Sequence, residues 1–131
     1  MPRILIIEDT ADLAELMAIT LRSAGHEVAI APDGASALRA VRGRQPDLVI
    51  VDIMLPDIVG LSLCETLRAG RADDEPRLPI LVVSACSEDE TRPISLAAGA
   101  DDFLPKPFSP YQLLLRVHAL LGTSAPERIA S

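Results

Sequence analysis

Aromatic residues are scarce in this chain of 131 residues. It contains no tryptophan, and its three aromatic side chains are Phe103, Phe108 and Tyr111. Hydrophobic residues nevertheless make up 49% of the sequence, so a sizeable core can form without disulfides or structural metals. The composition therefore predicts one domain whose core is built from Leu, Ile, Val and Ala.

Cysteine pairs, long apolar runs and excess positive charge are missing too. Cys64 and Cys86 form no CxxC motif, which is typical of reduced thiols in a cytosolic protein. The apolar stretches are too short to cross a bilayer, and the one after Met1-Pro2-Arg3 is too short for a secretory signal. The net charge is −7, from 12 basic and 19 acidic residues. We therefore expect a cytoplasmic domain that binds neither a membrane nor, by itself, nucleic acid.

Strand-like and helix-like segments alternate along the whole chain. Short apolar runs such as Ile4 to Ile7 indicate buried parallel strands, and helical spacing of apolar residues follows each run. The strands expected are 4–7, 27–31, 48–52, 80–84 and 102–105, and the helices expected are 11–24, 35–43, 61–69, 91–98 and 110–121. This pattern predicts an α/β fold, a (βα)₅ doubly wound parallel sheet with helices on both faces, in three α/β/α layers. Residues 1–121 would form the domain and 122–131 a tail or the start of a linker.

Two signals conflict at the fourth helix. Ser87 with Glu90 is typical of a capping box, which would start the helix early. Pro93 would then be the sixth helical residue, where it removes a backbone hydrogen bond. A start at Thr91 places Pro93 in the first turn, where proline is tolerated, so we predict the later and shorter helix.

Polar side chains follow the strands at their carboxyl ends: Glu8 and Asp9, Asp52, Ser84, and Lys106 just past the fifth strand. Each alone has an ordinary explanation, because acids cap helices, serines form turns and lysines cover surfaces. Parallel strands, however, bring their carboxyl ends to one edge of the sheet, where ligands bind. The combination indicates a site for a divalent cation and a phosphoryl group.

The three carboxylates suggest how such a site would work. Asp9 and Asp52, with Glu8 behind them, would hold Mg²⁺ through oxygen ligands. Without the ion, each carboxylate pair would repel by about 4 kcal/mol at about 4 Å and an effective dielectric near 20. Asp52 is the best candidate nucleophile, because the other two acids are needed for the metal, and its attack on phosphorus would form an acyl phosphate. Ser84 and Lys106 would bind phosphoryl oxygens.

With these residues in place, the chain resembles the receiver domain of bacterial two-component response regulators over residues 3 to about 121. The matching motifs run from the first strand to the last helix: Ile6-Ile7-Glu8-Asp9, Leu48-Val49-Ile50-Val51-Asp52, Leu55-Pro56 with Gly60, Ser84-Ala85, Gly99-Ala100-Asp101-Asp102-Phe103-Leu104 and Lys106-Pro107-Phe108. The resemblance implies a flavodoxin-like sheet of strand order 2-1-3-4-5. It also implies phosphorelay signal transduction, in which Asp52 accepts a phosphoryl group from a histidine kinase or a phosphotransfer protein.

Further roles come from the same resemblance. Glu8, Asp9, Asp52 and the backbone carbonyl of Met54 would hold Mg²⁺ or Mn²⁺. The Lys106-Pro107 bond would be a cis peptide. Ser84 and Phe103 would switch the surface made by the fourth helix, fifth strand and fifth helix. Such a chain is a phosphoacceptor switch and not an enzyme, because it catalyses only its own phosphorylation and dephosphorylation.

The same surface is a candidate homodimer face. Asp101, Asp102 and Arg116 resemble the charged residues of receivers that carry winged-helix DNA-binding domains, although Gln112 stands where that subfamily usually has glutamate. Met54 departs from the commonest pattern because its apolar side chain cannot orient an attacking water. His26 and His118 stand alone in the sequence and are assigned no role.

Three other classes of protein compete with this interpretation. A haloacid-dehalogenase-type phosphatase needs a second aspartate two residues after the nucleophile, where Met54 stands. A flavodoxin-like cofactor binder needs a glycine- or hydroxyl-rich phosphate loop after the first strand, where the segment from Glu8 to Asp12 is anionic. A pseudo-receiver used as a scaffold would lack some of the five pocket groups, and all five are present.

Overall fold

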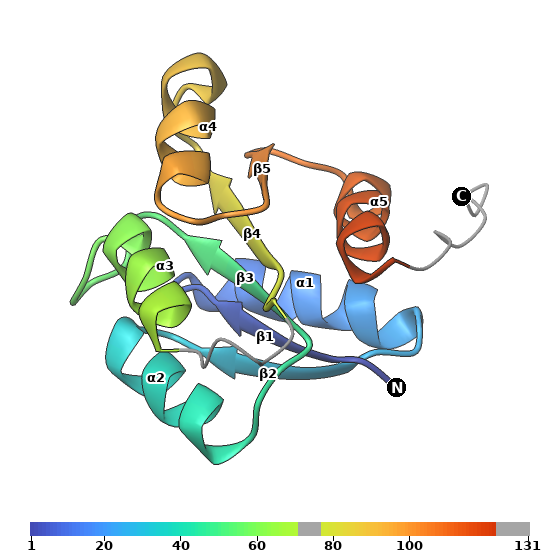
Figure 1. Ribbon diagram of the computed structural model, residues 1–131. Coiled ribbons are helices and arrows are strands. Elements are labelled where there is room, and N and C mark those ends of the chain that lie inside the picture. Colours follow the sequence, from blue (N-terminus) through green and yellow to red (C-terminus); the bar gives the residue numbers. More distant parts are fainter. Residues whose placement is uncertain (71–76, 123–131) are drawn as a thin grey trace.

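A parallel sheet forms the centre of the computed structural model, which describes residues 1–70 and 77–122. Its five strands lie in the order β2-β1-β3-β4-β5 (Figure 1). The strands are β1 (Arg3–Ile7), β2 (Glu27–Ala31), β3 (Leu48–Asp52), β4 (Ile80–Ser84) and β5 (Asp102–Pro105). The helices are α1 (Ala11–Ser23), α2 (Gly34–Gly43), α3 (Gly60–Ala69), α4 (Glu88–Ala97) and α5 (Pro110–Leu121). The flavodoxin-like (βα)₅ fold and its strand order are confirmed, and the tail predicted over 122–131 lies, from residue 123 onward, outside the described residues.

Two aliphatic cores fill the space between the sheet and its helices. Helices α2 and α3 cover one face of the sheet, and α1 and α5 cover the other (Figure 1). Successive strand residues point to opposite faces, so Leu5 and Ile7 pack beneath α2 and α3, while Ile4 and Ile6 pack beneath α1 and α5. Phe103 is the one aromatic side chain fully buried among the described residues. Full burial of one aliphatic side chain of these cores contributes about 1.5–3 kcal/mol to the stability of the fold. The packed sheet therefore fixes the positions of the residues at its carboxyl edge. None of the helices described has the length and apolar character needed to cross a membrane.

Helix α5 begins as its sequence predicts. Ser109 is the N-cap and Pro110 is the first helical residue. The Ser109 hydroxyl accepts a hydrogen bond from the Gln112 N–H at 3.1 Å, and the Gln112 side-chain oxygen accepts one from the Ser109 N–H at 2.8 Å. Gln112 therefore closes a capping box, which is a local role that explains its presence at this position.

Helix α4 begins at Glu88, so the predicted start at Thr91 is wrong. The Thr91 N–H donates to the Ser87 carbonyl at 2.9 Å, which makes Ser87 the N-cap, although its side chain forms no cap hydrogen bond. Three consecutive acids occupy the first turn, where the helix dipole favours negative charge. Arg92 also pairs with Glu88 one turn away at 3.2 Å. These interactions hold the early turn even though Pro93 lies inside the helix and supplies no N–H.

Candidate functional site

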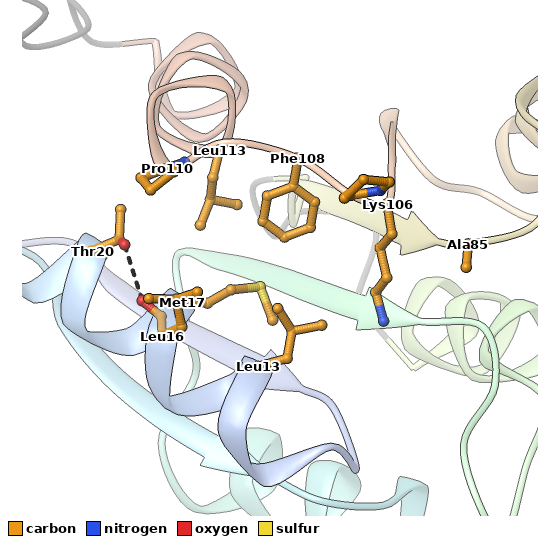
Figure 2. Close-up of a pocket in the computed structure, with 10 residues that line it drawn as sticks. Leu13, Leu16, Met17, Thr20, Ala85, Lys106, Phe108, Pro110 and Leu113 are labelled. Atoms are coloured by element: carbon orange, nitrogen blue, oxygen red, sulfur yellow. Dashed lines mark hydrogen bonds between the residues drawn. The ribbon is translucent and has the colours of Figure 1, made fainter.

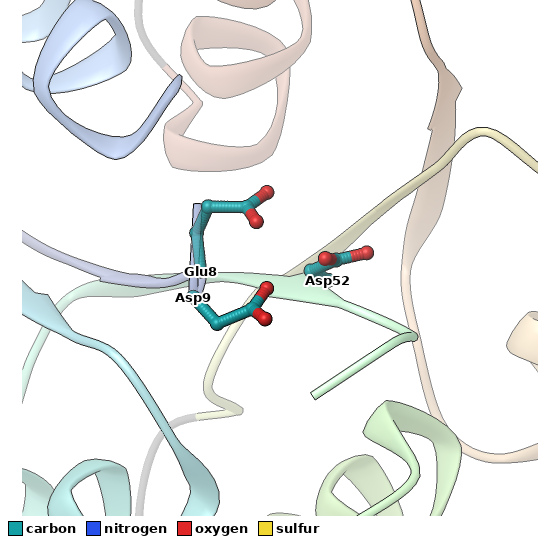
Figure 3. A group of neighbouring side chains, drawn as sticks. All are labelled: Glu8, Asp9 and Asp52. Atoms are coloured by element: carbon teal, nitrogen blue, oxygen red, sulfur yellow. The ribbon is translucent and has the colours of Figure 1, made fainter. Parts of the chain in front are cut away.

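Three carboxylates meet at the carboxyl edge of the sheet. Strands β1 and β3 are neighbours, with Ile7 opposite Val51, so the residues that follow them lie side by side. Oxygens of Glu8, Asp9 and Asp52 all lie within 4.8 Å of one another (Figure 3). At that distance and an effective dielectric near 20, two carboxylates repel by about 3.5 kcal/mol. This set of hard oxygen donors fits a divalent cation such as Mg²⁺, which would remove the repulsion.

Lys106 reaches the same cluster from the end of β5. Its Nζ lies 2.8 Å from a Glu8 carboxylate oxygen and 3.6 Å from an Asp52 oxygen. Glu8, Asp52 and Lys106 each stand two residues after a strand residue that packs beneath α1 and α5, so their side chains emerge on the same side of the sheet. Glu8 and Asp52 are buried. The lysine thus places one positive charge beside two of the three carboxylates, closer to Glu8 than to Asp52.

Ser84 and Phe103 lie on the opposite side of the sheet. Val82 pairs with Phe103 between β4 and β5, and both belong to the core beneath α3. Ser84 follows Val82 by two residues and therefore points to the same face. Ser84 and Phe103 are both 0% exposed. The Ser84 hydroxyl accepts a hydrogen bond from the Cys86 N–H at 3.0 Å, which links the end of β4 to the loop before α4.

Met54 stands in the loop between β3 and α3, beside the proposed nucleophile. Its N–H donates to an Asp52 carboxylate oxygen at 3.3 Å, and the residue is 68% exposed. Met54 and Val59 form an isolated antiparallel bridge across this loop. The Lys106-Pro107 bond is cis, as the family resemblance implies.

The three residues of the predicted dimer face do not share one set of partners. Asp102 accepts hydrogen bonds from Arg116 at 3.1 Å and from Arg92 at 3.1 Å. Asp101 instead accepts a hydrogen bond from the Ile80 N–H at 2.8 Å and pairs with Arg68 and Arg77. Asp102 and Arg116 thus share one surface, whereas Asp101 ties β5 to α3 and β4.

His26 and His118 are not isolated, contrary to the sequence interpretation. Both are buried, and their Nε2 atoms lie 2.7 Å apart. Burial lowers the pKa of His26, and the neighbouring His118 lowers it further. The contact joins residues 92 positions apart in the chain, which no local pattern could reveal. Cys64 and Cys86 are both free, and burial raises the pKa of the Cys64 thiol to about 12.

A groove of about 470 Å³ runs between α1 and α5 (Figure 2). Its walls are mostly apolar, and it reaches Lys106 and Ala85 at the carboxyl edge of the sheet. Leu16 on α1 contributes to the lining although the residue is 55% exposed. We call this feature the α1–α5 groove, and its apolar lining includes Leu13, Leu16, Met17, Phe108 and Leu113.

The fold and this edge define a class of protein, and the comparison with family models gives the same answer. The model of the response regulator receiver domain matches residues 4–118. The chain therefore belongs to the receiver domains of two-component response regulators, whose function is phosphorelay signalling.

Particular relatives agree with this assignment. The DNA-binding response regulator MtrA of Mycobacterium tuberculosis is 42% identical over 125 residues, which cover 95% of this chain and 53% of MtrA. The response regulator MprA of the same species is 41% identical over 128 residues, covering 98% of this chain and 54% of MprA. This chain thus spans about half the length of these relatives.

Solved structures show the same fold. The receiver domain of the Francisella response regulator 1452 superposes with a TM-score of 0.85 at 30% identity, covering 93% of this chain and 98% of that one. The BeF3-activated N-terminal receiver domain of Klebsiella pneumoniae RstA gives a TM-score of 0.82 at 32% identity, covering 91% and 97%.

Proposed function

We propose that Asp52 is the phosphoryl acceptor of this receiver domain. The observation that carries the proposal is the cluster of Glu8, Asp9 and Asp52 oxygens within 4.8 Å, with the Lys106 ammonium beside it. Asp52 is the acid among them that ends a buried central strand, so its carboxylate is held in place while Glu8 and Asp9 remain available as metal ligands. The chain is then a switch that is itself modified, and not an enzyme that turns over a separate substrate.

The transfer requires little more than positioning and charge compensation. An Asp52 oxygen forms a bond to phosphorus while the phosphorus–nitrogen bond of a partner's phosphohistidine breaks, and the imidazole leaves with that electron pair. Glu8, Asp9, Asp52 and the Met54 carbonyl would hold Mg²⁺ or Mn²⁺, which supplies charge neutralisation at the phosphoryl oxygens when bound. The Lys106 ammonium then pairs with a phosphoryl oxygen in place of part of its contact with Asp52.

The readout of the modification begins at Ser84. A phosphoryl group on Asp52 adds about two negative charges and three acceptor oxygens at the carboxyl edge of the sheet, which Ser84 also reaches because it is the last residue of the neighbouring strand β4. The Ser84 hydroxyl, which now accepts from the Cys86 N–H, would donate to one of those oxygens. Movement of Ser84 changes the packing around Phe103 on the same face of the sheet. The equilibrium between two arrangements of the α4-β5-α5 surface then shifts. The size of the shift is set by the difference between the free energies with which the two arrangements interact with the phosphoryl group.

The α1–α5 groove is the proposed docking place of the histidine kinase or phosphotransfer protein. Its apolar walls offer burial to a partner, and it opens at Lys106, directly beside the acceptor (Figure 2). A partner seated there would have its phosphohistidine within reach of Asp52. We place this exchange in the cytoplasm.

A homodimer through the α4-β5-α5 surface is a second proposed partnership. Arg92, Asp102 and Arg116 form partly exposed ion pairs there, which a second copy of the chain could exchange. Sedimentation with and without a phosphoryl mimic on Asp52 tests this, and an unchanged monomer would remove the proposal. The DNA binding named for MtrA belongs to that protein, and the net charge of −7 supports no direct nucleic-acid contact by this domain.

Incubation with a small-molecule phosphoryl donor and Mg²⁺, followed by measurement of the intact mass, tests the acceptor. We expect one added phosphoryl group, which is absent in Asp52→Asn and absent after chelation of the metal. Asp89→Asn, at an exposed aspartate of α4, is the matched control and should be phosphorylated like the parent. A phosphoryl group that persists in Asp52→Asn would contradict the proposal.

A further inference from the structure

We propose that Asp57 is a positioning residue for the metal site. The β3–α3 loop, residues 53–59, contains both Met54 and Asp57. The Asp57 carboxylate ties this loop to the first turn of α2 and thereby sets the position of the Met54 carbonyl. The inference rests on the proposed function, because it concerns the ion that Asp52 and Met54 would bind.

The hydrogen bonds at the start of α2 show the tie directly. The Gly34 N–H donates to one Asp57 oxygen at 2.8 Å, and the Ala35 N–H donates to the other at 3.0 Å. The Ser36 N–H donates to the Asp33 side chain at 2.7 Å. A helix leaves its first N–H groups without partners inside the helix. At α2, a loop more than twenty residues away supplies the acceptors for two of these groups.

The close approach depends on a glycine in α2. A Cβ atom at Gly34 would lie 2.3 Å from Ile58 Cγ2 and 3.3 Å from an Asp57 oxygen. A side chain at position 34 would therefore push the loop away from the helix. The absence of a side chain at Gly34 leaves the room that the two hydrogen bonds to Asp57 require.

The loop is also fixed at its other end. The Gly60 N–H donates to the Ile53 carbonyl at 2.7 Å, and the Met54–Val59 bridge draws the two arms of the loop together. Met54 therefore lies between the end of β3 and a segment that is attached to α2 through Asp57. With both ends attached, the Met54 carbonyl has little freedom to move relative to Asp52.

Asp57 acts through this geometry and not as a ligand. In the part of the chain that the structure describes, the carboxylates grouped closely enough for an ion are those of Glu8, Asp9 and Asp52. The negative charge of Asp57 is instead used at the helix N-terminus, where it is favourable. Residues that orient metal ligands typically change metal affinity by about 10–100-fold when they are lost. Because Asp57 acts through a short stretch of loop, we expect an effect of about fivefold, just below that range.

Mg²⁺ titration of the whole chain, followed by amide NMR, tests the inference. Asp57→Ala should raise the Mg²⁺ dissociation constant by about fivefold. Asp57→Asn keeps one acceptor oxygen and should give an intermediate value. The matched control is Asp33→Ala, which removes the other side-chain cap of α2 without touching the loop. It should lower the unfolding temperature and leave Mg²⁺ affinity unchanged.

A reciprocal measurement separates positioning from simple loss of stability. If Asp57 couples α2 to the metal site, Mg²⁺ must slow hydrogen exchange at the Gly34 and Ala35 amides in the parent, and this slowing must vanish in Asp57→Ala. If Asp57 only caps helix α2, the exchange rates of these two amides will be the same with and without Mg²⁺.

The outcomes distinguish this inference from the function on which it rests. Equal Mg²⁺ affinity in the parent and both Asp57 variants overturns the inference and leaves the acceptor proposal standing, as does an equal loss in Asp33→Ala. If Asp57→Ala does not fold, the comparison between Asp57→Asn and the parent decides the question. A parent chain that binds no Mg²⁺ would overturn both proposals.

Discussion

Gly60 is the position where a single methyl group should damage both stability and the site. A Cβ atom there would lie 2.3 Å from the Asp52 carbonyl oxygen and 2.7 Å from Ile53 Cα. These are backbone atoms, so no side-chain rotation can make room. Ordinary van der Waals contact begins near 3.4 Å, which means that helix α3 or strand β3 would have to move by about 1 Å.

The cost can be estimated from this displacement. Overpacking typically destabilises by about 1–3 kcal/mol. Strand β3 is hydrogen-bonded to β1 on one side and to β4 on the other, so it cannot yield easily, and we expect Gly60→Ala to cost about 3 kcal/mol. For a domain of this size that corresponds to a fall of about 10 °C in the unfolding temperature. Because the displaced carbonyl belongs to Asp52, Mg²⁺ binding should weaken as well.

Thermal and urea unfolding of Gly60→Ala measure the prediction, with Gly43→Ala as the matched control. Nothing lies within 4 Å of a Cβ atom built at Gly43, the last residue of α2. The control should be neutral or stabilising by up to about 1 kcal/mol, because alanine favours the helix more than glycine does. If Gly60→Ala unfolds within about 0.5 kcal/mol of the parent, the reasoning about the close packing of α3 on β3 is wrong.

Three other perturbations have clear expected outcomes. Arg68→Ala should lower the free energy of unfolding in urea by about 2–3 kcal/mol, because this arginine side chain, 18% exposed, donates hydrogen bonds to the Gly99 carbonyl and Asp101. Arg77→Ala, at a side chain 63% exposed, should lower it by less than about 1 kcal/mol, and equal losses would contradict the argument from burial. The pKa of His26 is lowered from 6.5 in the fold, so the unfolded chain takes up the proton first and stability should fall as the pH drops through 6.5. Unfolding temperatures measured against pH should show a smaller fall in His26→Phe, and an identical fall would exclude His26 as the cause. Pro93→Ala restores an N–H in the middle of α4 and should stabilise by about 1–2 kcal/mol in the same assay, whereas a loss would mean that the proline is favourable there.

Much of the fold and the acidic site could be predicted because their signals are local. The apolar runs of β1 and β3 lead directly into acidic residues, and parallel strands share one carboxyl edge, so the sequence predicts that Glu8, Asp9 and Asp52 lie close together. The alternation of side chains extends the argument, since Lys106 and Glu8 continue the same face of the sheet. The strand order came from the family resemblance, because periodicity alone does not distinguish which strands are neighbours.

The features that were missed depend on contacts between distant parts of the chain. Helix α4 starts early partly because Arg92, besides its pair with Glu88, bonds Asp102 and the Phe103 carbonyl on the neighbouring strand. The histidine pair joins the approach to β2 with α5. Asp57 has no sequence signal at all, because an aspartate that caps a distant helix looks the same in sequence as any acidic loop residue.

Helix α5 belongs to two surfaces at once. Leu113 lines the α1–α5 groove, while Arg116, one turn later, holds Asp102 on the other flank. A kinase in the groove and an effector on the α4-β5-α5 surface would therefore both contact helix α5. Each would favour a particular orientation of this helix, so their binding would be either competitive or cooperative. If the donor binds the two arrangements with different affinities, thermodynamic reciprocity requires that an output partner which prefers the phosphorylated arrangement also alters how tightly the donor is held. Binding of the output partner and dissociation of the phosphoryl donor would then be thermodynamically coupled.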